Sequence, residues 1–163
     1  MQTVATASRA DQTRALSLST VAFTACFAVW TIFSIIGVAI KAELGLNDTQ
    51  FGLLVATPIL TGSLTRIFLG VWTEKYGGRL VFSGQMLLAA LATWALTFAD
   101  TYIMYLVAAL GVGLAGGSFI IGVAYVSRWY DAGHQGTALG IFGAGNVGAA
   151  VTKFVAPFVM VAY

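Results

Sequence analysis

Two basic side chains inside apolar segments have the clearest chemical potential in this sequence. Arg66 lies in GSLTRIFLG, about seven residues, or roughly 10 Å along a helix, from the end of its apolar run. An arginine keeps its charge, and its planar guanidinium suits a bidentate bond to an oxyanion. No Asp or Glu interrupts the apolar runs to neutralise it. Two interpretations stay open: a side chain that reaches for the membrane interface, and an anion-binding site.

Lys153 is the second basic residue, and it lies deep in the last apolar run, one turn before Pro157. A buried lysine can lose its proton, unlike an arginine. Three roles are open for it: a side chain extended to the interface, a second anion contact, or a proton carrier.

Residues 143–148, GAGNVG, match the G-x-G-x-x-G pattern that is often associated with dinucleotide binding. That site needs a preceding strand, a following helix and an acidic residue about 20 positions later. No Asp or Glu follows Asp131, and the flanking residues continue an apolar run. Residues 111–116 match the same pattern in a similar setting. We therefore expect no bound nucleotide, and we interpret the glycines as sites of close helix packing.

Small residues four positions apart let two membrane helices approach closely. Two sets have this spacing: Gly136, Gly140 and Ala144, and Gly145 and Ala149. Packing does not explain Asn146, because an amide within a span is costly unless it is hydrogen-bonded. Either Asn146 forms an interhelical hydrogen bond, or it lines a polar pocket for which the glycines clear space.

The segments that carry these residues are apolar enough to cross a membrane. The chain has 163 residues, of which 59% are hydrophobic and 9% charged, against about 25% charged in soluble domains. Each run is long enough for a hydrocarbon core of roughly 30 Å, and lipid requires such runs to be helical. We predict an all-α membrane protein with five transmembrane helices. The predicted spans are 18–40, 49–73, 80–99, 101–127 and 137–163.

The charges between the runs predict the orientation. The first run is too long for the apolar core of a cleaved signal peptide, which has about 7–15 residues. We therefore interpret residues 1–17 as a retained cytoplasmic tail, which makes the protein a multi-pass one with a cytoplasmic N-terminus. The inner side then holds five basic residues and the outer side only Lys41, as the positive-inside rule requires. The five are Arg9, Arg14, Lys75, Arg79 and Arg128.

Composition also excludes several partners and cofactors. A net charge of +2 is too small to indicate nucleic-acid binding. Cys26 is the single cysteine, so it has no partner within the chain for a disulfide and no second thiolate for zinc. We expect no metal, no cofactor and no enzymatic activity. The expected surroundings are the lipid bilayer.

The stretch GVWTEKYGGR, which begins at Gly70, resembles the loop between helices two and three of the major facilitator superfamily. The family pattern combines a glycine for close packing, an acidic residue near a helix end and basic residues at the inner face. Gly70, Glu74, Gly78 and Arg79 occupy these positions, with Glu74 in place of the usual aspartate. The resemblance implies that these four residues form a conformational motif of a transporter.

The stretch GIFGAGNVGAAVTKFVAP resembles the glycine-rich signature in helix five of the nitrate/nitrite porter family. This resemblance implies secondary active uptake or exchange of nitrate and nitrite through the inner membrane, in nitrate assimilation. It implies that Arg66 is the substrate-binding arginine of helix two. It further implies that Phe119 is an aromatic of helix four at the anion site, and that Asn146 contacts the substrate beside Gly143 and Gly145.

The resemblance also raises a question of length. Such porters have twelve helices in two halves, and the second half supplies a further arginine. We therefore expect this chain to correspond to an N-terminal portion of a nitrate/nitrite transporter. Two alternatives stay open: a facilitator of another small anion or organic acid, and a small membrane-packing protein without transport.

Coupling of transport to protons is a further expectation. Import of an anion into a negative-inside cell opposes the membrane potential by about 2.3 kcal/mol per charge per 100 mV. The spans hold no acidic residue, and His134 lies in a loop. Lys153 is therefore this half's candidate for a proton-linked residue.

Overall fold

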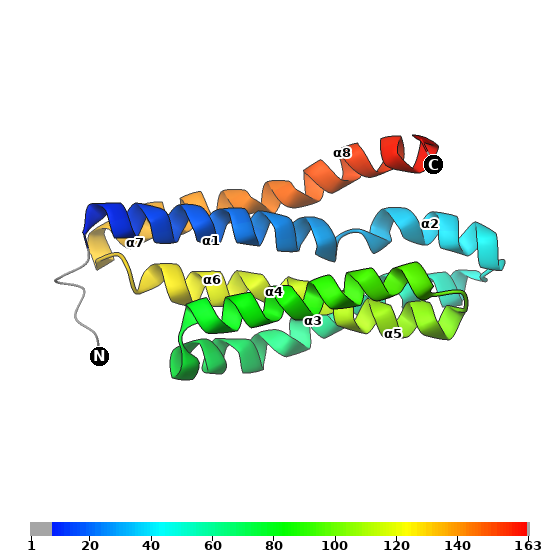
Figure 1. The fold of residues 1–163 in the computed structure, drawn as a ribbon, viewed down its shortest axis with the longest axis horizontal. Coiled ribbons are helices and arrows are strands. Elements are labelled where there is room, and N and C mark those ends of the chain that lie inside the picture. Colours follow the sequence, from blue (N-terminus) through cyan, green and yellow to red (C-terminus); the bar gives the residue numbers. More distant parts are fainter. Residues whose placement is uncertain (1–7, 163) are drawn as a thin grey trace.

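The computed structural model describes residues 8–162, and every regular element among them is a helix. The α-helices are α1 (Arg9–Trp30), α2 (Phe33–Leu44), α3 (Asp48–Tyr76), α4 (Gly78–Ala95), α5 (Tyr102–Gly113), α6 (Ser118–Ser127), α7 (Ala132–Gly143) and α8 (Val147–Ala162). The 3₁₀ segments are η2 (Leu96–Phe98), η3 (Leu114–Gly117) and η4 (Ala144–Asn146). Several of these elements follow one another end to end and form one long helical segment. We call each such segment a rod, and the rods pack side by side as a bundle (Figure 1).

Five of these rods are long and apolar enough to cross a membrane, as predicted. They run over Arg9–Leu44, Asp48–Tyr76, Gly78–Phe98, Tyr102–Ser127 and Ala132–Met160. Large apolar side chains stay exposed along them, for example Ile67, Leu80 and Phe154. This exposure suits a bundle that is surrounded by lipid, because lipid tails are as apolar as these side chains.

The first rod begins earlier than the sequence indicates. The α1 helix starts at Arg9, so it includes residues 9–17 of the predicted tail, while residues 1–7 lie outside the described part. Ser8 caps the helix, because its hydroxyl accepts a hydrogen bond from the backbone N–H of Asp11 at 3.1 Å. Such a cap satisfies a backbone donor that would otherwise have no partner, which favours helix in this polar segment.

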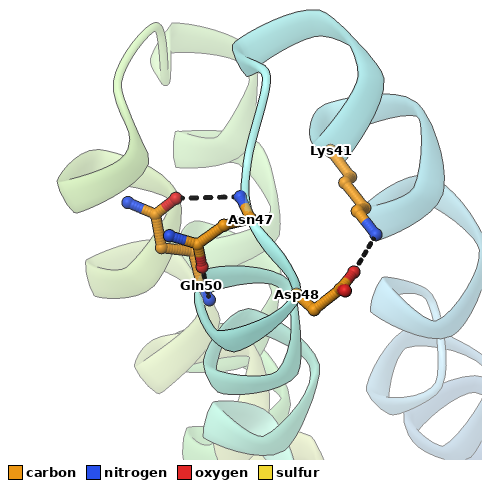
Figure 2. A network of polar contacts seen from close by, with 4 residues as sticks. All are labelled: Lys41, Asn47, Asp48 and Gln50. Atoms are coloured by element: carbon orange, nitrogen blue, oxygen red, sulfur yellow. Dashed lines mark hydrogen bonds and ion pairs between the residues drawn. The ribbon is translucent and has the colours of Figure 1, made fainter.

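The turn between α2 and α3 is fixed by local hydrogen bonds (Figure 2). Gly45 ends α2 in the left-handed conformation, with φ of 60°, which glycine adopts without strain. Asn47 and Gln50 form a reciprocal capping box at the start of α3, with bonds of 2.9 and 3.1 Å. The Nζ of Lys41 lies 2.6 Å from a carboxylate oxygen of Asp48 and links the two helices.

The connections alternate between the two ends of the bundle. The start of α1, the α3–α4 turn and the α6–α7 turn lie at one end, and the α2–α3 and α4–α5 turns lie at the other (Figure 1). Gly77 makes the α3–α4 turn with φ of 88°. Asp131 begins α7 and accepts hydrogen bonds from the backbone and the ring of His134. The bond from the His134 ring holds the pKa of the Asp131 carboxyl below its usual value.

Three of the five rods are interrupted near the middle. Thr31 and Ile32 separate α1 from α2, η3 separates α5 from α6, and η4 separates α7 from α8. The two G-x-G-x-x-G matches, 111–116 and 143–148, overlap η3 and η4. Glycine lowers helix stability by about 1 kcal/mol relative to alanine. Both glycine-rich stretches therefore mark places where a membrane helix departs from α geometry.

The glycines that pack closely agree only in part with those predicted. A Cβ atom on Gly136 or Gly140 would meet none of the described residues within 4 Å, so neither lies against a second helix there. Close packing occurs at Gly145, which belongs to the second predicted set and lies against Phe23, and at Gly148, which was not predicted and lies against the Thr24 carbonyl. Within residues 8–162 the first set therefore does not make the predicted contact, because α7 packs against α1 and α6 through residues other than these two glycines.

Two buried clusters hold the rods together. One is built mainly on α1, α4, α6 and α7, and the other on α2, α3 and α5. The first contains Phe23, Ile121, Val126 and Phe142, and the second contains Phe33, Leu54 and Val112, all of which are almost fully buried. The two clusters meet near the interruption of the first rod, where Val29 packs against both.

Candidate functional site

Arg66 lies in the middle of α3 and is partly buried. Its Nε donates a hydrogen bond of 3.2 Å to the carbonyl oxygen of Gly116, and its Cζ lies 5.4 Å from the centre of a Trp30 ring. The ion pairs among residues 8–162 join Lys41 to Asp48 and Asp131 to His134, so Arg66 belongs to neither. Its charge is therefore met by a carbonyl and an aromatic face, and not by a carboxylate within the described part.

The Gly116 carbonyl is available to Arg66 because of the η3 interruption. Three consecutive carbonyls there accept hydrogen bonds from side chains. Leu114 accepts from Gln85 Nε2 at 2.7 Å, Ala115 from Ser118 Oγ at 2.7 Å, and Gly116 from Arg66 Nε. Irregular backbone at membrane depth is tolerated where it is buried in protein and its polar groups find partners. The glycine-rich stretch of the fourth rod thus supplies the bond that fixes Arg66.

Phe119 is the second residue of α6 and leaves 38% of its surface exposed. It belongs to a series of ring contacts that we call the aromatic row, whose centroids lie 4.8–6.1 Å apart. Its members are Phe119, Phe142, Phe23, Phe27 and Trp30. The row starts at Phe119 and ends at Trp30, beside Arg66. It therefore connects two of the predicted site residues through side chains of α1.

The three predicted substrate-binding residues of the fifth rod lie in η4 or directly before it. Gly145 is buried against Phe23 of the aromatic row. A Cβ on Gly143 would meet none of the described residues within 4 Å, and Asn146 is exposed. The Asn146 amide donates a hydrogen bond of 2.8 Å to the Gly143 carbonyl. The alternative of an interhelical bond for Asn146 is therefore wrong within residues 8–162, because η4 offers it an acceptor in its own rod.

Lys153 lies on α8, one residue after Thr152, whose hydroxyl donates to the Ala28 carbonyl at 2.9 Å. Lys153 itself is exposed, and it forms no ion pair with the residues that the structure describes. Thr152 thus faces α1, while Lys153 points away from that contact. The structure brings Arg66, Phe119 and Gly145 to the first rod, and it does not place Lys153 with them.

The predicted conformational motif, Gly70, Glu74, Gly78 and Arg79, lies toward the end of the bundle that holds the start of α1. Gly78 is buried, and a Cβ there would meet the Tyr125 ring at 2.5 Å. Gly70 makes an ordinary contact, since its Cβ would lie 3.5 Å from Ile120, so the close packing occurs at Gly78 and not at Gly70. Glu74 and Arg79 are exposed. Arg79 lines a cavity of about 450 Å³ that also includes Arg14 and Tyr125.

The first rod supplies the residues that sequence reasoning missed. No residue of α1 was among the predicted site residues, yet Phe23, Phe27 and Trp30 connect the other elements. An aromatic residue in an apolar run gives no signal of its own, because it fits a lipid-facing or packed position equally well. The one available hint was that Trp30 stands where two polar residues interrupt the run, at Thr31 and Ser34.

Comparison with known proteins shows a single family over most of the chain. Residues 18–163 match the Major Facilitator Superfamily. A probable nitrate/nitrite antiporter, NarK1, from Thermus thermophilus is 47% identical over 91% of this chain and 34% of that protein. A nitrite extrusion protein of Bacillus subtilis (strain 168) is 34% identical over 88% of this chain and 36% of that protein. A probable nitrate transporter, NarT, of Staphylococcus carnosus (strain TM300) is 30% identical over 87% and 37%.

These three relatives share one description, since each is named as a transporter of nitrate, of nitrite or of both. The chain spans about a third of the length of the curated relatives it matches. The matched part includes both glycine-rich interruptions and the α3 helix that carries Arg66.

Proposed function

This chain belongs to the Major Facilitator Superfamily, and on that premise we propose that it takes part in moving nitrate and nitrite across the membrane. The observation that carries the proposal is the state of Arg66. In residues 8–162 Arg66 donates one hydrogen bond, from its Nε to the Gly116 carbonyl. The two terminal nitrogens of the guanidinium remain free to donate in parallel to two oxygens of a planar oxyanion.

The neighbouring residues suit such an anion. Phe119 is partly exposed and follows Gly116, whose carbonyl binds Arg66, by three residues, so its ring can bound the space beside the anion with little competing polarity. Asn146 is exposed, and its amide can exchange the local bond to Gly143 for a bond to an oxygen of the anion. Gly143 and Gly145 both precede Asn146, and neither carries a side chain that would crowd its amide. We assign substrate binding to these five residues.

Exchange of nitrate for nitrite is electrically neutral, so it does not work against the membrane potential. Net uptake of either anion does, at about 2.3 kcal/mol per 100 mV, and it needs a coupled cation such as the proton. Lys153 supports proton coupling only by its position within the fifth rod and its lack of an ion pair with the described residues. We retain it as the proton-linked candidate of this part of the transporter.

We further propose an inner-membrane location with the N-terminus in the cytoplasm. The support is the distribution of basic residues over the two ends of the bundle (Figure 1). Arg9, Arg14, Lys75, Arg79 and Arg128 lie at the end where α1 begins, and Lys41 lies near the opposite end. Basic residues favour the cytoplasmic side of a membrane protein.

Counterflow in proteoliposomes tests the proposed substrates. Vesicles that contain the protein as expressed from its own gene are loaded with nitrate, nitrite or formate, and the entry of external labelled nitrate is followed. We expect nitrate and nitrite inside to drive entry, and formate to fail. Exchange with formate and not with nitrite would favour the alternative of an organic-acid facilitator and contradict the proposal.

A further inference from the structure

Trp30 occupies an unusually well-fixed position at the point where the first rod breaks. It is the last residue of α1, and its indole Nε1 donates a hydrogen bond of 2.9 Å to the carbonyl of Pro58 in α3. Pro58 itself is almost fully buried. The Phe27 ring lies 5.3 Å from the Trp30 ring, in a tilted arrangement. One edge and one side of the indole are therefore held by residues of two different rods.

Two glycines make the room for this indole. A Cβ on Gly116 would come within 2.6 Å of the Trp30 ring, and a Cβ on Gly62 would come within 2.9 Å of its Nε1. Both distances are too short for real atoms, so any other residue at either position would displace the ring. Gly62 and Gly116 are both buried. The indole is thus fitted between α3 and η3, and its plane is set by the backbone of both.

The same two elements hold the Arg66 side chain. Its Nε bonds to the carbonyl of Gly116, and its Cζ lies 5.4 Å from the centre of the Trp30 ring. A guanidinium at this distance is attracted to the face of an aromatic ring, most strongly where water is excluded. The bond to Gly116 fixes one edge of the guanidinium, and the indole restricts rotation about that edge.

We propose that Trp30 is a positioning residue, which fixes the plane of the Arg66 guanidinium so that its two terminal nitrogens present a flat fork to a planar anion. The inference rests on the proposed function for the identity of the anion, but the contact between the two side chains does not. When such a fork holds two oxygens of an anion, the third oxygen of planar nitrate lies in the same plane, whereas that of a pyramidal anion such as chlorate projects out of it. A freely rotating arginine would discriminate less between the two shapes.

The first experiment tests the positioning without any substrate. Phenylglyoxal, which condenses with the guanidinium nitrogens, is applied to the protein as expressed from its own gene, and modification of the Arg66 peptide is followed by mass spectrometry. We expect Trp30→Leu to speed modification about threefold or more, which is the range that the lost ring contact implies. Trp94→Leu is the matched control, because Trp94 is 64% exposed on α4 and contacts Phe98.

Two further variants keep this test decisive if Trp30→Leu does not fold. Trp30→Phe retains an aromatic face and loses the bond to Pro58, so its rate should fall between those of wild type and Trp30→Leu. Gly116→Ala keeps the tryptophan and pushes its ring aside, so it should speed modification as well. An Arg66 modification rate equal to or lower than that of wild type in the folded variants would overturn the proposal.

The second experiment measures selectivity in reconstituted vesicles. We expect Trp30→Leu to raise the KM for nitrate about threefold or more, to change Vmax less, and to narrow the preference for nitrate over chlorate. A role in stability alone would lower the amount of active protein and leave the KM and the preference unchanged. Absence of any nitrate transport by the wild type would contradict the proposed function, while the phenylglyoxal result would still decide the positioning.

Discussion

At the residue scale, the proposed anion binding depends on how little the charge of Arg66 is neutralised by residues 8–162. A carboxylate partner would compete with any incoming anion for the same donors. The carbonyl of Gly116 and the face of Trp30 hold the side chain without that competition. A snorkelling arginine would need neither contact. The structure thus gives a physical reason to prefer the anion-site interpretation, because both contacts orient the guanidinium within the bundle.

One prediction at the residue scale concerns Lys153. If this amine carries the coupled proton, Lys153→Gln should abolish uphill nitrate accumulation and flatten the dependence of uptake on external pH. Exchange of nitrate for nitrite should continue, because it needs no coupled charge. Uptake is measured against external pH in cells or vesicles with an imposed proton gradient.

A different result would contradict a role of Lys153 in proton coupling. A Lys153→Gln variant that keeps the wild-type pH dependence and still accumulates nitrate against its gradient would remove Lys153 from the coupling mechanism. Its exposed position on α8 would then be that of a lysine directed to the membrane interface.

At the element scale, the interruptions explain why so much glycine occurs in apolar helices. At η3 the carbonyl of Gly116 accepts a hydrogen bond from Arg66, and directly before η4 the carbonyl of Gly143 accepts one from Asn146. Short 3₁₀ stretches within longer helices often coincide with functional positions. Here the two interruptions lie beside α1, with Gly116 against Trp30 and Gly145 against Phe23. The glycines of the G-x-G-x-x-G pattern therefore allow close helix packing and leave backbone carbonyls accessible to polar side chains.

An element-scale prediction follows from the contrast between two glycines of the fifth rod. Gly148 faces the Thr24 carbonyl so closely that a methyl group would separate α8 from α1. Gly148→Ala should therefore lower the free energy of unfolding by about 1–3 kcal/mol, as overpacking does. Gly140→Ala is the control, since a Cβ there meets none of the described residues within 4 Å. It should be neutral, or stabilising by up to about 1 kcal/mol.

Thermal or denaturant unfolding in detergent micelles would compare the two variants with wild type. Equal stability of Gly148→Ala and Gly140→Ala would show that α1 and α8 are not in close backbone contact, contrary to the structure.

Hydrophobicity was sufficient to predict the rods but not their interruptions. The five spans were foreseen because run length and charge placement determine which segments can cross a membrane. The position of Arg66 within a span could also be predicted from the apolar run around it. The role of Trp30 could not be predicted, because it depends on contacts with Gly62, Gly116 and Pro58, which lie far away along the chain. The choice of Gly148 over Gly136 as a contact depends on where α1 crosses, which periodicity within one segment does not reveal.

At the scale of the whole molecule, the alternating ends of the bundle give a prediction about orientation. With Cys26 replaced by serine, a single cysteine at Lys75 should react with a membrane-impermeant maleimide only from the cytoplasmic side. A cysteine at Glu43 should react only from the outer side. Both positions are exposed, and neither has a positive φ. A cysteine at the nearby Gly77 would be strained, because φ is 88° there. Labelling of the Lys75→Cys variant from the outer side alone would reverse the proposed topology.

The central claim is that Arg66 binds the anion through its fork, and one substitution tests it most directly. Arg66→Lys keeps the charge and removes the planar pair of donors. Nitrate/nitrite exchange by the protein as expressed from its own gene is measured in vesicles at equal protein content, with Arg14→Lys as the matched control at an exposed position. Loss of charge-assisted hydrogen bonds predicts that Arg66→Lys lowers exchange about tenfold or more, while Arg14→Lys exchanges normally. Near-normal exchange by Arg66→Lys would contradict the account.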